Sequence, residues 1–120
     1  MKKALQITDG ERYQYLIDKA VETKTVWLLK AIDGMFAMFE DDKGQEYLPI
    51  WPEKEFTKFY VQDDWEEYEA EEMKIYEFLN WMQELSDDKI LIAAFPDENN
   101  KVIPIPPLEI RKHLELLLKN

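Results

Sequence analysis

The chain has 120 residues, a formal net charge of −11 and 46% hydrophobic residues, which suits one folded domain with a single core. Its acidity argues against binding nucleic acid or an anionic membrane through bulk charge. The absence of cysteine excludes disulfides, thiolate metal sites and cysteine nucleophiles, and fits a cytoplasmic protein. Residues 1–7 are expected to be a flexible N-terminus. The start of the chain is basic but has no apolar run behind it, so we do not expect a signal peptide.

The N-terminal third predicts a helix followed by a β-hairpin. Apolar residues recur at helical spacing over residues 9–22, so this segment should form an amphipathic helix. Residues 25–32 are rich in β-forming residues, and the pair Asp33-Gly34 that follows is a strong hairpin signal. We expect residues 35–39 to return as the second strand and residues 45–50 to add a third, which gives an antiparallel meander.

Residues 47–60 form a corner between the meander and the helical half of the chain. Pro49 lacks a backbone N–H, which places it at a strand end or a sheet edge. Pro52 favours an extended Trp51 and suits the first turn of a helix. Trp51 should pack in the seam below that helix, although an aromatic binding shelf of Trp51, Phe56 and Tyr60 is the alternative.

An acidic segment follows the corner. Residues 40–77 contain 14 acidic and 4 basic residues, so nearly all of the net charge lies here. Seven of the ten residues 63–72 are acidic, with Trp65 and Tyr68 between them. Such a run of repelling charges predicts a loop or a solvated entry into the next helix, which should end near residues 86–88.

The C-terminal half predicts two strands and a last helix. Residues 90–95 are a short apolar run typical of a central strand. Residues 102–105 contain Pro104 and should form an edge strand, and Pro106 and Pro107 open the final helix. The expected order is helix, three strands, two helices, two strands and helix. This order predicts an α+β protein with one mainly antiparallel sheet of four or five strands, in a single domain over residues 1–120.

The sequence resembles a family of small bacterial proteins known as domain of unknown function 2750. The matching motifs are Val26-Trp27-Leu28-Leu29, Asp33-Gly34, Leu48-Pro49-Ile50-Trp51-Pro52-Glu53-Lys54-Glu55-Phe56 and Ala93-Ala94-Phe95-Pro96. The resemblance spans roughly residues 11–118 and implies a single-domain bacterial cytoplasmic protein. The layout is also similar in architecture to the amino-terminal domain of SseB-type proteins. Neither resemblance implies a reaction or a catalytic residue.

The sequence offers little for catalysis. His113 is the only histidine and Ser86 the only serine, and neither has a partner nearby in the sequence. The acidic residues lie in runs, which indicates solvation more than a buried acid–base pair. Residues 41–46 lack the alternating acids of a calcium loop. We therefore expect no catalytic residue, no cofactor and no metal.

Three functional hypotheses remain, of which the third, an enzyme that uses carboxylates, would need an acid with a raised pKa. The first is a non-catalytic protein-interaction module, such as an adaptor, an inhibitor or an immunity-like protein, that binds a basic protein. Its binding surface would comprise Asp63, Asp64, Trp65, Glu66, Glu67 and Tyr68, with neighbouring acids up to residue 72. The second is a small-molecule site at the corner, lined by Trp27, Trp51 and Tyr60. We expect a monomer or a weak homodimer, because prolines interrupt both edge strands.

Overall fold

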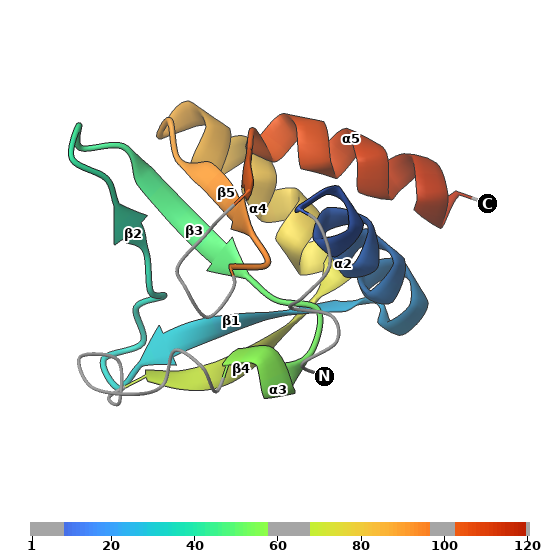
Figure 1. The fold of residues 1–120 in the computed structure, drawn as a ribbon, viewed down its shortest axis with the longest axis horizontal. Coiled ribbons are helices and arrows are strands. Elements are labelled where there is room, and N and C mark those ends of the chain that lie inside the picture. The colour runs from blue at the N-terminus through green and yellow to red at the C-terminus, as the bar shows by residue number, and fades with distance from the viewer. Residues whose placement is uncertain (1–8, 58–67, 97–102, 120) are drawn as a thin grey trace.

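The computed structural model describes residues 9–57, 68–96 and 103–119 (Figure 1). The protein has an α+β fold, as predicted. The described helices are α2 (Asp9–Thr23), α3 (Lys54–Thr57), α4 (Ile75–Asp87) and α5 (Pro107–Leu118). The described strands are β1 (Thr25–Ala31), β2 (Phe39–Glu40), β3 (Glu46–Ile50), β4 (Tyr68–Lys74), β5 (Leu91–Ala94) and β6 (Ile103–Ile105).

Strands β1 and β4 form a two-stranded antiparallel ribbon, which runs along the lower side of the view in Figure 1. The predicted meander is wrong at this point, because β1 takes β4 as its full partner. After the turn at Gly34 the chain touches β1 only briefly, through a bridge between Lys30 and Phe36. It then leaves β1, and β2 pairs with β3 instead.

The second sheet has the order β2-β3-β5-β6. Strands β3 and β5 are parallel, while β2 and β6 pair antiparallel on either side. The prediction of one mainly antiparallel sheet is therefore corrected to two sheets with a parallel pair at the centre of the larger one. As predicted, β5 is a central strand and β6, with Pro104, an edge strand. Pro49 is the second-to-last residue of β3, beyond the two residues that pair with β2.

A single bridge between two tryptophans joins the sheets. Trp27 and Trp51 exchange backbone hydrogen bonds, with N···O distances of 2.9 Å and 2.8 Å. Trp51 is therefore extended, as the following proline predicts. The bridge fixes the ribbon across the end of β3, and it places the corner where both sheets meet.

Helices α2, α4 and α5 lie together on one side of the larger sheet (Figure 1). The predicted helix over residues 9–22 is confirmed, and its apolar stripe enters the core. Helix α4 ends at Asp87, also as predicted. From these three helices the core receives Leu16, Ile17, Ala20, Ile75, Phe78, Leu79, Met82, Leu85, Ile110 and Leu114, all buried.

Candidate functional site

The acidic segment is a β-strand over the part that the structure describes. The prediction of a loop or helix entry is wrong for Tyr68–Lys74, which forms β4. Pairing with β1 supplies the backbone hydrogen bonds that a run of acidic side chains cannot supply, so the strand forms despite its charge. Of the predicted interaction surface, Asp63, Asp64, Trp65, Glu66 and Glu67 lie outside the described residues.

The register of the ribbon sorts the acids of β4 onto two faces. Cross-strand partners share a face, so Glu69 and Glu71 lie with Lys30 and Leu28. Lys30 Nζ is 3.8 Å from Glu71 Oε1, and each of the two side chains in this ion pair is about 40% exposed. Glu72 lies on the opposite face beside Trp27 and is exposed. This strand therefore presents carboxylates to solvent on both faces.

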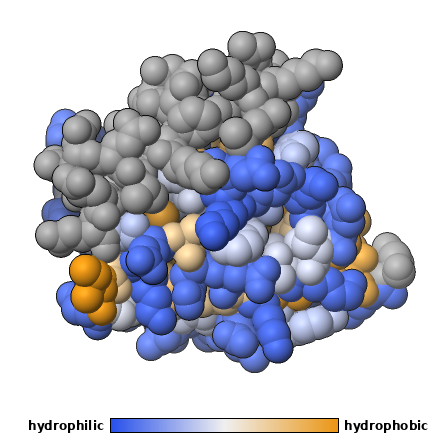
Figure 2. All heavy atoms as spheres, turned by 90° about the horizontal axis from the view of Figure 1, so that it is seen from below, coloured by the Kyte–Doolittle hydropathy of each residue, from blue (hydrophilic) through white to orange (hydrophobic). Residues whose placement is uncertain are grey.

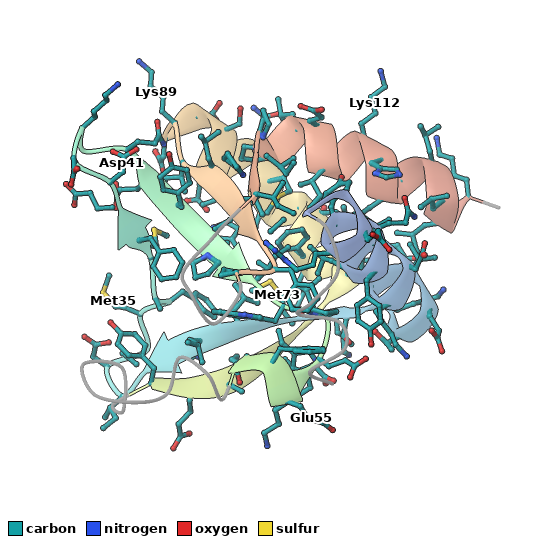
Figure 3. The ribbon with its side chains drawn as sticks, viewed as in Figure 1. Met35, Asp41, Glu55, Met73, Lys89 and Lys112 are labelled. Atoms are coloured by element: carbon teal, nitrogen blue, oxygen red, sulfur yellow. The ribbon has the colours of Figure 1, made fainter. Side chains whose placement is uncertain are left out.

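Two exposed apolar side chains stand at the tip of the turn that follows β1. Ile32 is 89% exposed and Met35 is 68% exposed. Met35 points away from the body of the molecule (Figure 3). The face seen in Figure 2 is mostly hydrophilic where it is coloured, and a strongly hydrophobic group of atoms projects at its left edge. Large exposed apolar side chains beside charge are a common feature of protein-binding surfaces.

A shallow hollow connects the exposed tip to the acidic strand. It has a volume of about 300 Å³ and is lined by Lys30, Ala31, Ile32, Glu69, Ala70 and Glu71. Glu69 and Glu71 flank the hollow from one face of β4, and the side chain of Ala70 between them points to the other face. We call β4, the tip residues Ile32 and Met35, and this hollow the acidic ribbon surface. The exposed tip was not predicted from the sequence, although apolar residues on both sides of an Asp-Gly turn are a visible signal.

The aromatic corner is packed, as the core interpretation expects. Trp51 is completely buried, and Phe56 is 1% exposed. The Trp51 indole N–H donates to the Pro96 carbonyl oxygen at 3.3 Å. Phe56 contacts Phe95 with ring centroids 4.7 Å apart. Tyr60, the third residue of the suggested shelf, lies outside the described residues.

The carbonyl of Phe95 receives a hydrogen bond from a buried arginine. Phe95 has a backbone φ of 43°, in the left-handed region that bulky residues rarely adopt. Arg12 is 2% exposed, and its Nε–H donates to this carbonyl oxygen at 3.3 Å. Arg12 therefore connects the start of α2 to the end of β5. This role of Arg12 was not predicted from the sequence, although Arg12 lies four residues before buried Leu16 on the same helix face.

Tyr15 connects the same helix to the corner. Its hydroxyl donates to Glu53 Oε1 at 2.6 Å, and Lys19 Nζ lies 3.8 Å from that oxygen. Burial, the hydrogen bond to Glu53 and nearby carboxylates raise the pKa of Tyr15 to about 12. A protonated hydroxyl in this position stabilises the fold and supplies no base for catalysis.

His113 has a partner that the sequence did not predict. The Tyr13 hydroxyl lies 3.0 Å from His113 Nδ1, and the two rings lie 5.7 Å apart. Burial, followed by the charge of Glu109, raises the pKa of Tyr13. This pair joins α2 to α5.

The described residues contain no group of three or more histidine, cysteine or acidic side chains that could hold a metal ion. A search of the same residues found no helix with the length and apolar character that crossing a membrane requires.

Fold and surface define a small α+β protein with two joined sheets and an acidic ribbon. Residues 13–114 match the family model described as Protein of unknown function (DUF2750), and the chain belongs to this family. The predicted resemblance is thereby confirmed. Searches of curated proteins and of solved structures found no match.

Proposed function

We propose that this protein is a non-catalytic, cytoplasmic interaction module that binds a basic protein through the acidic ribbon surface. The observation that carries the proposal is the position of the acidic strand β4 beside the exposed apolar tip. Ile32 and Met35 supply apolar contact area, and Glu69, Glu71 and Glu72 supply charge. Apolar contacts hold an interface together, while complementary charge speeds the encounter and selects the partner.

The charge distribution of the whole chain supports a basic partner. Residues 40–77 hold 14 of the 26 acidic residues and 4 of the 15 basic ones. A concentrated field of this kind attracts positively charged surfaces and repels acidic ones. Screening by salt should weaken such a complex steeply.

A pull-down from native lysate tests this proposal. The full chain is compared with the ribbon variant Glu69→Gln/Glu71→Gln/Glu72→Gln at low and high salt. A control variant, Glu84→Gln/Asp87→Asn/Asp88→Asn, removes the same charge from exposed positions around the end of α4. Retained proteins are identified by mass spectrometry.

The expected result is a basic protein that the wild type and the control variant retain in low salt. The ribbon variant should lose it, and high salt should release it from all three. Retention of the same proteins by all three chains would contradict the proposal, as would retention that salt does not change.

A further inference from the structure

We propose that the outer edge of β4 accepts an extended basic segment of the partner as an additional antiparallel strand. This inference rests on the proposed function and specifies how the partner binds. It identifies the ligand as a strand that carries lysine or arginine at alternating positions. Three features carry it: the direction of the backbone groups of β4, an edge that pairs with no second strand among the described residues, and the charges on its two faces.

The backbone bonds of β1 fix which groups of β4 face outward. In an antiparallel pair, residues that bond to the partner strand alternate with residues that point away from it. On the side of β1 away from β4, Trp27 bonds to Trp51, Leu29 accepts from Ala37, and Ala31 donates to Met35. The backbone N–H and C=O groups of these β1 residues therefore point away from β4.

The backbone groups of their cross-strand partners in β4 point away from β1 in the same way. Ala70 is opposite Leu29, and Glu72 is opposite Trp27. The hydrogen bond from Ile75 N to Lys24 O, 2.8 Å long, confirms this alternation at the end of the ribbon. The N–H and C=O groups of Ala70 and Glu72 thus form the outer edge of β4.

This edge has no strand beside it within the described residues, where β1 is the only partner of β4. An unpaired edge is a template for another strand, because its donors and acceptors are already spaced for pairing. Many peptide-binding domains use this mode, in which the backbone gives affinity and alternate side chains give specificity.

Charge selects the occupant of the edge. Glu69 and Glu71 share one face of β4 with Lys30, and Glu72 shares the other with Lys74. The first face is thus the more negative one. A second copy of this chain would bring its own acidic strand and place like charges opposite each other, which is unfavourable. A basic strand would place cations there instead.

The geometry also predicts the pattern of the partner strand. Lysines of an antiparallel segment should lie opposite Glu69 and Glu71, and apolar residues opposite Ala70 and Glu72. In that register the apolar residues direct their N–H groups toward β4, and the lysines direct theirs away. The hollow lined by Lys30, Glu69 and Glu71 lies on the face of the partner's lysines and leaves room for a lysine side chain.

N-methylated peptides test this arrangement without altering the protein. The probe is a fluorescent capped peptide of about nine residues that alternates lysine and valine. One derivative is N-methylated on its central valines and another on its central lysines. Binding to the full chain is measured by fluorescence anisotropy at low salt.

Strand addition predicts that methylated valines weaken binding by about tenfold or more, because two backbone hydrogen bonds are lost. Methylated lysines should leave the affinity within about threefold, since those N–H groups face solvent. The variant Ala70→Pro should reproduce the loss with the unmodified peptide, because it removes an outward N–H and no charge. Circular dichroism and urea unfolding establish that this variant is folded.

The outcomes separate this inference from the proposed function. If both methylated peptides bind like the parent, and the ribbon variant Glu69→Gln/Glu71→Gln/Glu72→Gln still loses binding, strand addition is wrong and the acidic interaction stands. If the parent peptide does not bind, or binds the ribbon variant equally well, both are wrong. A concentration-dependent dimer that excludes the peptide would show a second copy at the edge and would also overturn the inference.

Discussion

Single polar side chains connect segments of this protein that are far apart in the sequence. The Tyr15 hydroxyl connects α2 to Glu53 at the corner, and Arg12 connects the same helix to the end of β5. Each donor satisfies an oxygen that the fold has partly removed from water. Losing such a donor costs more than the bond itself contributes, because the acceptor remains desolvated.

Tyr15 predicts a specific loss of stability in alkali. The pKa of Tyr15 is about 12 in the folded protein, chiefly because burial disfavours the tyrosinate, whereas the ordinary pKa of a tyrosine is 10.0. Below pH 10 the hydroxyl is protonated in both states, and its stabilisation is fully present. As the pH rises from 10 through 12, the unfolded chain ionises first, so the stabilisation is lost.

We therefore expect the free energy of unfolding to fall less steeply above pH 10 in Tyr15→Phe than in the wild type. Urea denaturation at about pH 9 and pH 11.5 measures the difference. Tyr76→Phe, at a side chain 58% exposed, is the control and should follow the wild type. Equal slopes in all three proteins would show that Tyr15 does not titrate as described.

At the scale of elements, the junctions between helices and strands carry backbone strain. Helix α4 ends with hydrogen bonds from Lys89 N to Ser86 O and from Ile90 N to Leu85 O, at 3.0 Å and 2.9 Å. This pattern is a Schellman motif, which usually has glycine at the left-handed position. Here Lys89 holds that position with a φ of 61°.

Lys89→Gly should stabilise the protein by about 1 kcal/mol, because glycine adopts the left-handed conformation without a steric cost. The denaturation midpoint should rise with an unchanged slope. Lys112→Gly is a matched control, since Lys112 also points to solvent (Figure 3) but lies within α5. That control should lose about 1 kcal/mol. If Lys89→Gly destabilised the protein as Lys112→Gly does, the backbone at Lys89 would not be strained.

At the scale of the whole molecule, net charge opposes compactness. The chain carries −11 at pH 7, and folding holds these charges closer together than the expanded unfolded chain does. Repulsion of this kind favours the expanded unfolded state and is screened by salt.

We expect the melting temperature to rise between about 0.02 M and 0.3 M sodium chloride. Over this range the Debye length, the distance over which charges interact, shortens to less than about 10 Å. The ribbon variant Glu69→Gln/Glu71→Gln/Glu72→Gln should respond less, because it has already lost part of the repulsion. Thermal unfolding followed by circular dichroism measures both responses. A wild-type melting temperature that falls with salt would mean that attractive ion pairs outweigh the repulsion.

The sequence by itself determined the helices, most of the strands and their ends. The spacing of apolar residues and the positions of glycine and proline are local properties of the sequence. The apolar stripe of α2, the turn at Gly34 and the prolines at 49, 52 and 104 could therefore be interpreted without a structure. The burial of Trp51 also followed from its place between Ile50 and Pro52. Local chemistry was sufficient at each of these positions.

Only the tertiary structure decided which strands pair. The backbone hydrogen bonds of a strand go to another segment, so the residues of the strand alone do not determine which segment it pairs with. The parallel pairing of β3 with β5 joins segments about 44 residues apart, as in Tyr47 opposite Leu91. The acidic strand β4 exists because β1 completes its backbone bonds, and this pairing outweighs the repulsion that its sequence shows. The acidic ribbon surface is a product of that pairing.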